Sequence, residues 1–206
     1  TTMTKGGKPS QRPFIIPIFV PHMGCPHQCV FCNQTSITGS NANMSPGSIT
    51  EIINEISEKV ALRSPAFQGA PYDQLRAQRG NRLRREIAFY GGSFTGMEKK
   101  VQIHLLSAIQ PLIRRGLIDS VRVSTRPDYI DPQTLDLLKE YGVKTVELGV
   151  QSMVNEVLRC SKRGHTTDDV LRAAELLHGG GFEVGIQIMA GLPGDNARRN
   201  GQTVDR

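Results

Sequence analysis

Five short apolar runs alternate with helix-like patterns along most of the chain. The runs have the length and character of buried strands and lie at residues 14–20, 87–90, 121–124, 145–150 and 182–188. Stretches with helical periodicity or helix-capping residues separate them, at 48–62, 97–115, 131–142 and 166–177. This alternation predicts an α/β fold built on a parallel sheet with right-handed crossovers.

Three cysteines follow the first apolar run in a C-x3-C-x2-C pattern. They are Cys25, Cys29 and Cys32, and Phe31 stands just before the last of them. Three thiolates can hold three irons of a cubane 4Fe–4S cluster and leave the fourth iron open to a substrate or cofactor. Phe31 places an aromatic ring beside such a cluster, where a flat base can pack.

Structural zinc is the alternative interpretation of these cysteines. Zinc needs a fourth ligand, which His22 or His27 would supply. The chain would then be a zinc-stapled nucleic-acid-binding module. The remaining cysteine, Cys160, lies on a predicted helical segment and is expected to be an ordinary packed thiol.

Each predicted strand is followed by a glycine-rich or polar motif. After the cysteine loop these motifs are Gly91-Gly92-Ser93-Phe94, Thr125-Arg126-Pro127-Asp128, Gln151-Ser152 and Ala190-Gly191-Leu192-Pro193-Gly194. In a barrel-like parallel sheet, the loops after the strands share one face, and active sites form there. A zinc knuckle has no need of four further motifs around its metal, so this placement favours the cluster.

The cysteine spacing, with an aromatic residue before the third cysteine, resembles the signature of radical S-adenosylmethionine (SAM) enzymes. Five later motifs resemble the radical SAM core of the Elongator catalytic-subunit family, whose enzymes modify wobble uridines in tRNA. They are Tyr90-Gly91-Gly92-Ser93-Phe94, Ser124-Thr125-Arg126-Pro127-Asp128, Val146-Glu147-Leu148-Gly149-Val150-Gln151-Ser152, Arg163-Gly164-His165-Thr166 and Gly191-Leu192-Pro193-Gly194. The pattern is similar, more loosely, to oxygen-independent coproporphyrinogen dehydrogenases.

The resemblance implies a partial (β/α)6 TIM-like barrel, of which this chain is expected to contain about five strands. The core domain is predicted at residues 14–194, after a polar tail at 1–13 and with a basic connector or insertion at 64–85. Residues 195–206 are predicted to be an incomplete segment, because the sixth strand is expected beyond them. Within it, residues 196–206 are expected to be mobile or only partly helical, since they lack a core to dock on.

The resemblance also implies the cofactors and their ligands. The three cysteines would bind a 4Fe–4S cluster, and SAM would chelate the fourth iron. An electron from a reductant such as flavodoxin or ferredoxin would then cleave SAM to methionine and a 5'-deoxyadenosyl radical. The residues expected to bind SAM are Phe31, Gly91, Gly92, Ser93, Phe94, Ser124, Arg126, Gln151, Arg163 and Gln187.

Several of these residue types can bind the ammonium, carboxylate and ribose groups of SAM. Paired glycines permit close backbone approach, so that carbonyl groups can accept hydrogen bonds from the SAM ammonium. Arg126 is a planar donor for the SAM carboxylate, with a surface salt bridge to Asp128 as its alternative. The amides of Gln151 and Gln187 suit ribose hydroxyls or backbone groups. Arg163 is expected to reach SAM or the substrate, or to belong to a capping loop.

Much of the net charge of +6 lies in one stretch. Residues 75–85 hold no acid and five arginines, namely Arg76, Arg79, Arg82, Arg84 and Arg85. Such a run can neutralise phosphates and suits an RNA partner, while a solvated loop is the alternative because no aromatic residue is interleaved. The clustered cysteines indicate a reducing compartment, and no apolar run approaches the roughly 20 residues of a membrane helix. We therefore expect a cytoplasmic protein without membrane contact.

Overall fold

The computed structural model describes residues 13–20, 25–32 and 84–205, together with the single positions 51, 54, 56 and 58. Its five strands are all paired in parallel, in the order β1-β2-β3-β4-β5. They are β1 (Phe14–Phe19), β2 (Arg85–Tyr90), β3 (Ser120–Thr125), β4 (Val143–Gln151) and β5 (Glu183–Ile188). The predicted five-stranded parallel sheet is confirmed.

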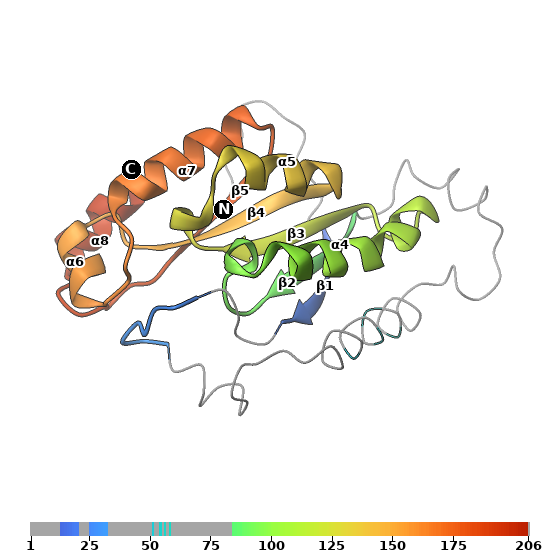
Figure 1. Ribbon diagram of the computed structural model, residues 1–206. Helices are drawn as coiled ribbons and strands as arrows, with labels where there is room; N and C mark the ends of the chain where they lie inside the picture. Colours follow the sequence, from blue (N-terminus) through green and yellow to red (C-terminus); the bar gives the residue numbers. More distant parts are fainter. Residues whose placement is uncertain are drawn as a thin grey trace.

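Three helices connect consecutive strands and lie on the same side of the sheet (Figure 1). They are α4 (Lys99–Arg114), α5 (Pro132–Glu140) and α7 (Thr167–Gly179). Two short 3-10 turns, η3 (Phe94–Gly96) and η4 (Pro127–Tyr129), follow β2 and β3. Because the strand order follows the chain and the crossover helices share one face, the sheet is singly wound, as in a TIM-like barrel.

The helix starts agree with the capping residues of the sequence. Asp131 accepts a hydrogen bond from the backbone N–H of Thr134 at 2.7 Å, and Pro132 occupies the first turn of α5. Thr166 and Asp169 form a reciprocal capping box at the start of α7. Each arrangement pairs backbone groups that a helix end leaves without an intrahelical partner.

The hydrophobic core lies between the sheet and these helices. Alternate residues of the strands, such as Phe89 and Val123, meet fully buried leucine and isoleucine residues of α4, such as Leu105 and Ile109. Phe94 of η3 stacks on Phe89 with 5.2 Å between the ring centroids. One face of the sheet is therefore used for packing, and on β2, β3 and β4 the opposite face carries polar side chains such as Glu86, Arg122 and Glu147.

An ionic network covers that opposite face. Glu86 is completely buried and accepts hydrogen bonds from Arg122, whose guanidinium also pairs with Glu147 at 2.7 Å. Arg84 binds both carboxylate oxygens of Glu183 at 2.5 and 2.6 Å, although β2 and β5 are three strands apart in the sheet. At about 4.8 Å per strand, a flat sheet would separate them by about 14 Å. This contact indicates that the sheet curls toward its polar face.

The two edges of the described sheet differ. Pro17, which weakens a strand prediction, lies on β1 at one edge, where a missing backbone donor is tolerated. β5 forms the other edge, and there Ile186 and Ile188 are 53% and 48% exposed.

Two further helices lie near the end of the sheet where the strands terminate, α6 (Asn155–Cys160) and α8 (Ala197–Val204). The sequence predicts that residues 196–206, which contain α8, are mobile or only partly helical. It is helical because Asn196 caps its start and Thr203 accepts a hydrogen bond from the backbone N–H of Met153. As expected of a segment without a core to dock on, α8 buries no residue.

The predicted helix at 48–62 is described only at positions 51, 54, 56 and 58, which are helical. The polar tail up to residue 12 and the basic connector up to residue 83 lie outside the described residues. Within the described part of the chain, no helix has the length and apolar character that crossing a bilayer would require.

Candidate functional site

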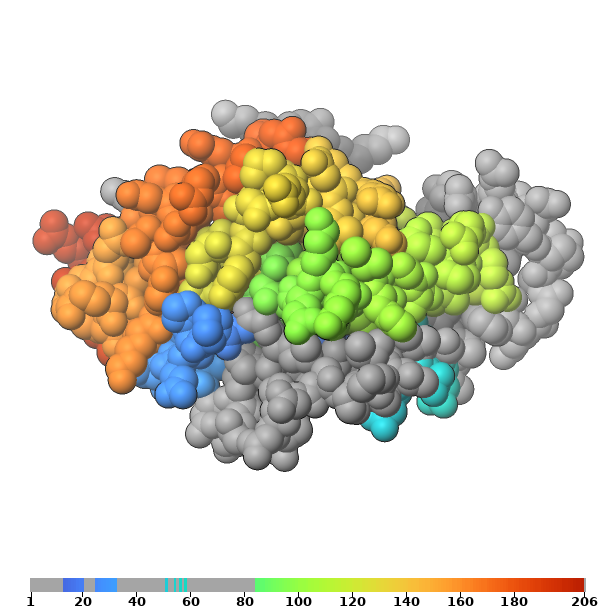
Figure 2. All heavy atoms as spheres, viewed as in Figure 1, coloured from blue at the N-terminus to red at the C-terminus, as the bar shows by residue number. Residues whose placement is uncertain are grey.

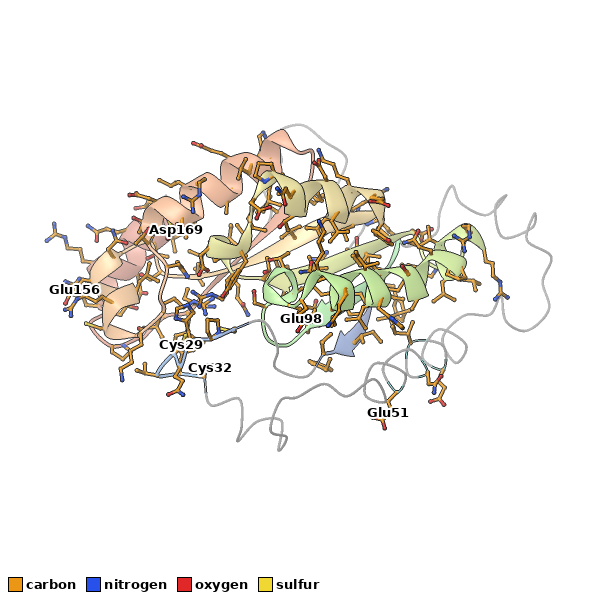
Figure 3. The ribbon with its side chains drawn as sticks, viewed as in Figure 1. Cys29, Cys32, Glu51, Glu98, Glu156 and Asp169 are labelled. Carbon is orange, nitrogen blue, oxygen red and sulfur yellow. The ribbon has the colours of Figure 1, made fainter. Side chains whose placement is uncertain are left out.

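The cysteine loop lies at the end of the sheet where the strands terminate. Figure 2 shows the blue segment 25–32 against the orange segment after β4, and Figure 3 places Cys29 and Cys32 on the loop below α6. The backbone N–H of Val30 donates to the carbonyl of Ser161 at 3.2 Å, and Cys32 N–H donates to the Cys29 carbonyl at 2.9 Å. Cys29 is buried, and none of the three cysteines forms a disulfide bond.

Arg163 joins this loop to β4. Its Nη1 lies 3.6 Å from the sulfur of Cys29, and its Nη2 donates to the carbonyl oxygen of Gly149 at 2.7 Å. A side chain at Gly149 would place Cβ only 2.8 Å from that Nη2, so it would displace the guanidinium from the position where it crosses the strand. Arg163 is 8% exposed, which removes water from its contact with the thiol.

Arg126 approaches the loop from the end of β3. Its Nε and Nη2 each donate to a carboxylate oxygen of Asp128 at 2.9 Å, and its Nη1 lies 3.9 Å from the sulfur of Cys25. The salt bridge offered as the alternative therefore forms, but it is buried rather than at the surface, since the Arg126 side chain is 3% exposed. Burial lowers the pKa of Arg126 and the Asp128 hydrogen bonds raise it, with a net rise that keeps the guanidinium charged.

His27 holds the cysteine loop in place by packing against the segment after α6. Its ring lies against Gly164, where an added Cβ would come within 2.2 Å of the His27 Cε1 atom. Gly164 also has φ +80°, a left-handed conformation that glycine adopts without strain. Burial, followed by the charge of Arg126, lowers the pKa of His27. His27 thus packs on the segment after α6, which agrees with its expected role of shaping the loop.

No group of three or more cysteine, histidine, aspartate or glutamate side chains, among the described residues, surrounds a position where one metal ion could bind. That arrangement is a requirement of a mononuclear site. In a cubane cluster each cysteine binds a different iron, so the thiolates stand further apart.

Three buried polar atoms at the end of β4 and in the segment that follows it have no hydrogen-bond partner among the described residues. They are Oε1 of Gln151, Nε of Arg163 and Nδ1 of His165. Leaving such atoms unpaired is costly, and a polar ligand would satisfy them. Gln151 also has φ +70°, a strained conformation for a residue other than glycine. The Oε1 acceptor of Gln151 fits the ammonium or a hydroxyl group of SAM, and the Nε donor of Arg163 fits its carboxylate. The thiols of Cys25 and Cys29, each beside an arginine, fit an anionic cluster.

The paired glycines after β2 both have positive φ, +94° at Gly91 and +59° at Gly92. A Cβ at Gly91 would lie 2.4 Å from the carbonyl oxygen of Val20. The close approach at Gly91 is therefore to the end of β1. The predicted contact with SAM stays a prediction for both glycines.

The remaining predicted SAM ligands are spread over three environments. The Ser93 hydroxyl lies 2.9 Å from that of Thr125, also buried, and Phe94 belongs to the core. The Ser124 hydroxyl donates to Glu147 on the polar face of the sheet. Phe31 is half-buried and Gln187 is exposed on β5. Sequence reasoning missed Gly149 as a site residue, although a glycine inside an apolar strand often marks a close approach.

His165 gives the site a dependence on pH. Burial, and then the charges of Arg163 and Arg126, lower its pKa to about 4. The unfolded chain binds a proton near pH 6.5, so the free energy of unfolding should fall as the pH drops from 6.5 toward 4, by up to about 1.4 kcal/mol per pH unit. Urea unfolding of the cluster-free protein at several pH values should show that His165→Gln removes this slope. The same change at exposed His104 should keep it, and equal slopes in both variants would contradict the assignment.

The sequence model of the Radical SAM superfamily matches residues 19–206. A curated relative, the tRNA uridine(34) acetyltransferase of Methanocaldococcus infernus, is 28% identical over 204 aligned residues, which cover 84% of this chain and 36% of that protein. Protein YhcC of Escherichia coli K12 is 32% identical over 130 residues, which cover 61% of this chain and 41% of that protein. The chain thus spans well under half of the length of either relative.

Two solved structures share the fold. The archaeal Methanocaldococcus infernus Elp3 superposes with a TM-score of 0.60 at 22% identity, over 95% of this chain and 42% of that one. The coproporphyrinogen III oxidase HemN of Escherichia coli, a radical SAM enzyme, superposes with a TM-score of 0.62 at 19% identity, over 98% and 42%. At such identities the likeness establishes the partial TIM-like barrel fold.

Proposed function

Because this chain belongs to the radical SAM superfamily, we propose that Cys25, Cys29 and Cys32 bind its 4Fe–4S cluster and that the chain cleaves SAM. When bound, the reduced cluster supplies the electron that splits SAM into methionine and a 5'-deoxyadenosyl radical. The observation that carries the proposal is the pair of buried guanidinium groups facing the sulfurs of Cys25 and Cys29. Positive charge at this position suits thiolates bound to iron, and the enzymes of this family require an external reductant.

We propose that Arg163, rather than Arg126, is the main partner of the SAM carboxylate. Its Nε is buried without a partner among the described residues, whereas Arg126 already directs two of its nitrogens to Asp128. The Oε1 atom of Gln151 is the acceptor that a ribose hydroxyl or the SAM ammonium would satisfy. Burial of these groups strengthens each contact, since little water competes for them.

We propose further that the substrate is a tRNA and that the electron donor is a flavodoxin or ferredoxin of the cytoplasm. The tRNA assignment is supported by the name of the Methanocaldococcus relative and by the basic connector. Of the five arginines predicted to contact RNA, Arg84 pairs with Glu183 and Arg85 with Asp119. Arg76, Arg79 and Arg82 lie outside the described residues, and we propose that they contact phosphates.

Metal and sulfide analysis of the 206-residue chain tests the proposed function. After anaerobic reconstitution with iron and sulfide, the protein should be brown and contain about four irons and four sulfides. A colourless protein with one zinc would contradict it and would favour the zinc-stapled nucleic-acid-binding module.

Gly92→Val should weaken SAM binding while the iron content stays close to that of the parent. A β-branched side chain would block backbone approach to the cofactor, and φ +59° would strain it. Equilibrium dialysis of SAM with the reconstituted protein measures the effect. Gly181→Val is the matched control, because Gly181 has φ +78° and an added Cβ would meet no atom within 4 Å apart from its chain neighbours. If both variants bound SAM as the parent does, the glycine pair would be a structural turn only.

Replacing Arg76, Arg79 and Arg82 together with glutamine should weaken tRNA binding and leave SAM cleavage without tRNA unchanged. Each lost phosphate contact should flatten the slope of log K against log salt by about 0.7 to 0.9. A filter-binding series across salt concentrations measures this slope, with Arg172→Gln on the exposed face of α7 as the control. An unchanged slope would show that the connector is a solvated loop.

A further inference from the structure

Two of the three predicted cluster ligands face a buried arginine. The Nη1 atoms of Arg163 and Arg126 lie 3.6 Å from the sulfur of Cys29 and 3.9 Å from that of Cys25. The partners are 134 and 101 residues apart in the sequence and come from the loop after α6 and from the end of β3. The folded sheet therefore brings two positive charges to one small loop.

These charges are fixed rather than mobile. Arg163 is held by the carbonyl of Gly149, and Arg126 by the two oxygens of Asp128. Both side chains are nearly excluded from water. Charge in such surroundings is screened far less than at a surface.

A three-thiolate cubane becomes more negative by one charge when it takes up an electron. Hydrogen bonds to the sulfurs and nearby positive charge stabilise that reduced state and raise the reduction potential. Asp128 acts in the opposite direction, because its carboxylate neutralises Arg126 at 2.9 Å. The site therefore contains a positive charge, on Arg126, and a negative charge that partly cancels it, on Asp128.

We propose that Arg163 and Arg126 set the reduction potential of the cluster upward through Cys29 and Cys25, and that Asp128 limits the contribution of Arg126. This proposal rests on the proposed function, since it requires that the cysteines hold a cluster. It makes the two arginines positioning residues for electron uptake, a role distinct from binding SAM. The electron comes from the external reductant, and no bond is formed or broken in this step.

The test is an anaerobic redox titration of the reconstituted cluster, monitored by electron paramagnetic resonance in the absence of SAM. Three variants have predicted signs. Arg163→Gln and the double variant Arg126→Gln with Asp128→Asn should lower the midpoint potential, and Asp128→Asn alone should raise it. The potential shifts by the extent to which a charge interacts more strongly with the reduced than with the oxidised cluster. Each change should alter the ratio of reduced to oxidised cluster about tenfold at a fixed potential, or about 59 mV for one electron.

Arg159→Gln is the matched control, because this exposed arginine lies 4.0 Å from the sulfur of Cys160, outside the cysteine loop. Its midpoint potential should equal that of the parent. Iron content and circular dichroism establish folding, and Asp128→Asn keeps both arginines, so one sign remains testable if an arginine variant fails to fold.

Opposite shifts for Arg163→Gln and Asp128→Asn would support the proposal. Potentials that match the parent in both variants, at full iron content, would overturn it and leave the proposed function intact. A parent protein that takes up no cluster would overturn the two together.

Discussion

Replacing Cys29 with alanine is expected to abolish the production of 5'-deoxyadenosine from SAM and to leave the protein with little bound iron. Two thiolates cannot hold a cubane whose fourth iron must stay open to a cofactor. The loss should be complete rather than partial, because a cluster that is not bound transfers no electron. The same result is expected for Cys25→Ala and Cys32→Ala, measured by iron analysis and by chromatography of the SAM products.

Cys160→Ala is the control for these three variants. Cys160 lies at the end of α6 and contacts Glu156 and Arg159, outside the cysteine loop. Its replacement should leave iron content and SAM cleavage unchanged. If Cys160→Ala lost iron as severely as Cys29→Ala, the ligand assignment would be wrong.

Arg122→Met is expected to lower the free energy of unfolding by about 3 kcal/mol. Arg122 binds Glu86 and Glu147, and Glu86 is completely buried. Removing one partner of a buried ion pair leaves the other charge without full compensation, which is the costly outcome for such pairs. Arg84 still pairs with Glu86 at 2.7 Å, so the loss should stay at the lower end of the usual range. Urea unfolding of the cluster-free protein at neutral pH measures it.

Arg159→Met provides the comparison for that loss. Arg159 is 74% exposed and pairs with Glu156 one turn away on α6. An exposed pair of this kind contributes little, because water and salt screen it. Its replacement should therefore leave the unfolding midpoint unchanged. Equal destabilisation by the two substitutions would contradict the importance assigned to burial of the network.

The order of the strands and helices along the chain could be predicted from local sequence patterns. Strand runs, the caps at Asp131 and Thr166 and the motif after each strand depend on neighbouring residues, and the observed elements confirm them. The polar network was not predicted. Glu86 and Glu183 lie on strands far apart in the chain, and Arg84 contacts both across the folded sheet.

The same limit applies to the candidate site. The cysteine spacing predicted the ligands, but Arg163 comes to Cys29 across 134 residues, which no local pattern encodes. Phe94 illustrates the reverse case, since a phenylalanine after a glycine pair suits a cofactor or a core equally well. Packing places it against Phe89 in the core. The surface salt bridge considered for Arg126 forms with Asp128 but is buried.

We propose that this chain cleaves SAM with a cluster bound at Cys25, Cys29 and Cys32. The most direct test is to reduce the anaerobically reconstituted chain with dithionite in the presence of SAM and to quantify the products. We expect 5'-deoxyadenosine and methionine in equal amounts, both dependent on the reductant and on the cluster. A protein that carries the full cluster and binds SAM, yet forms neither product above the level of the Cys29→Ala variant, would contradict it.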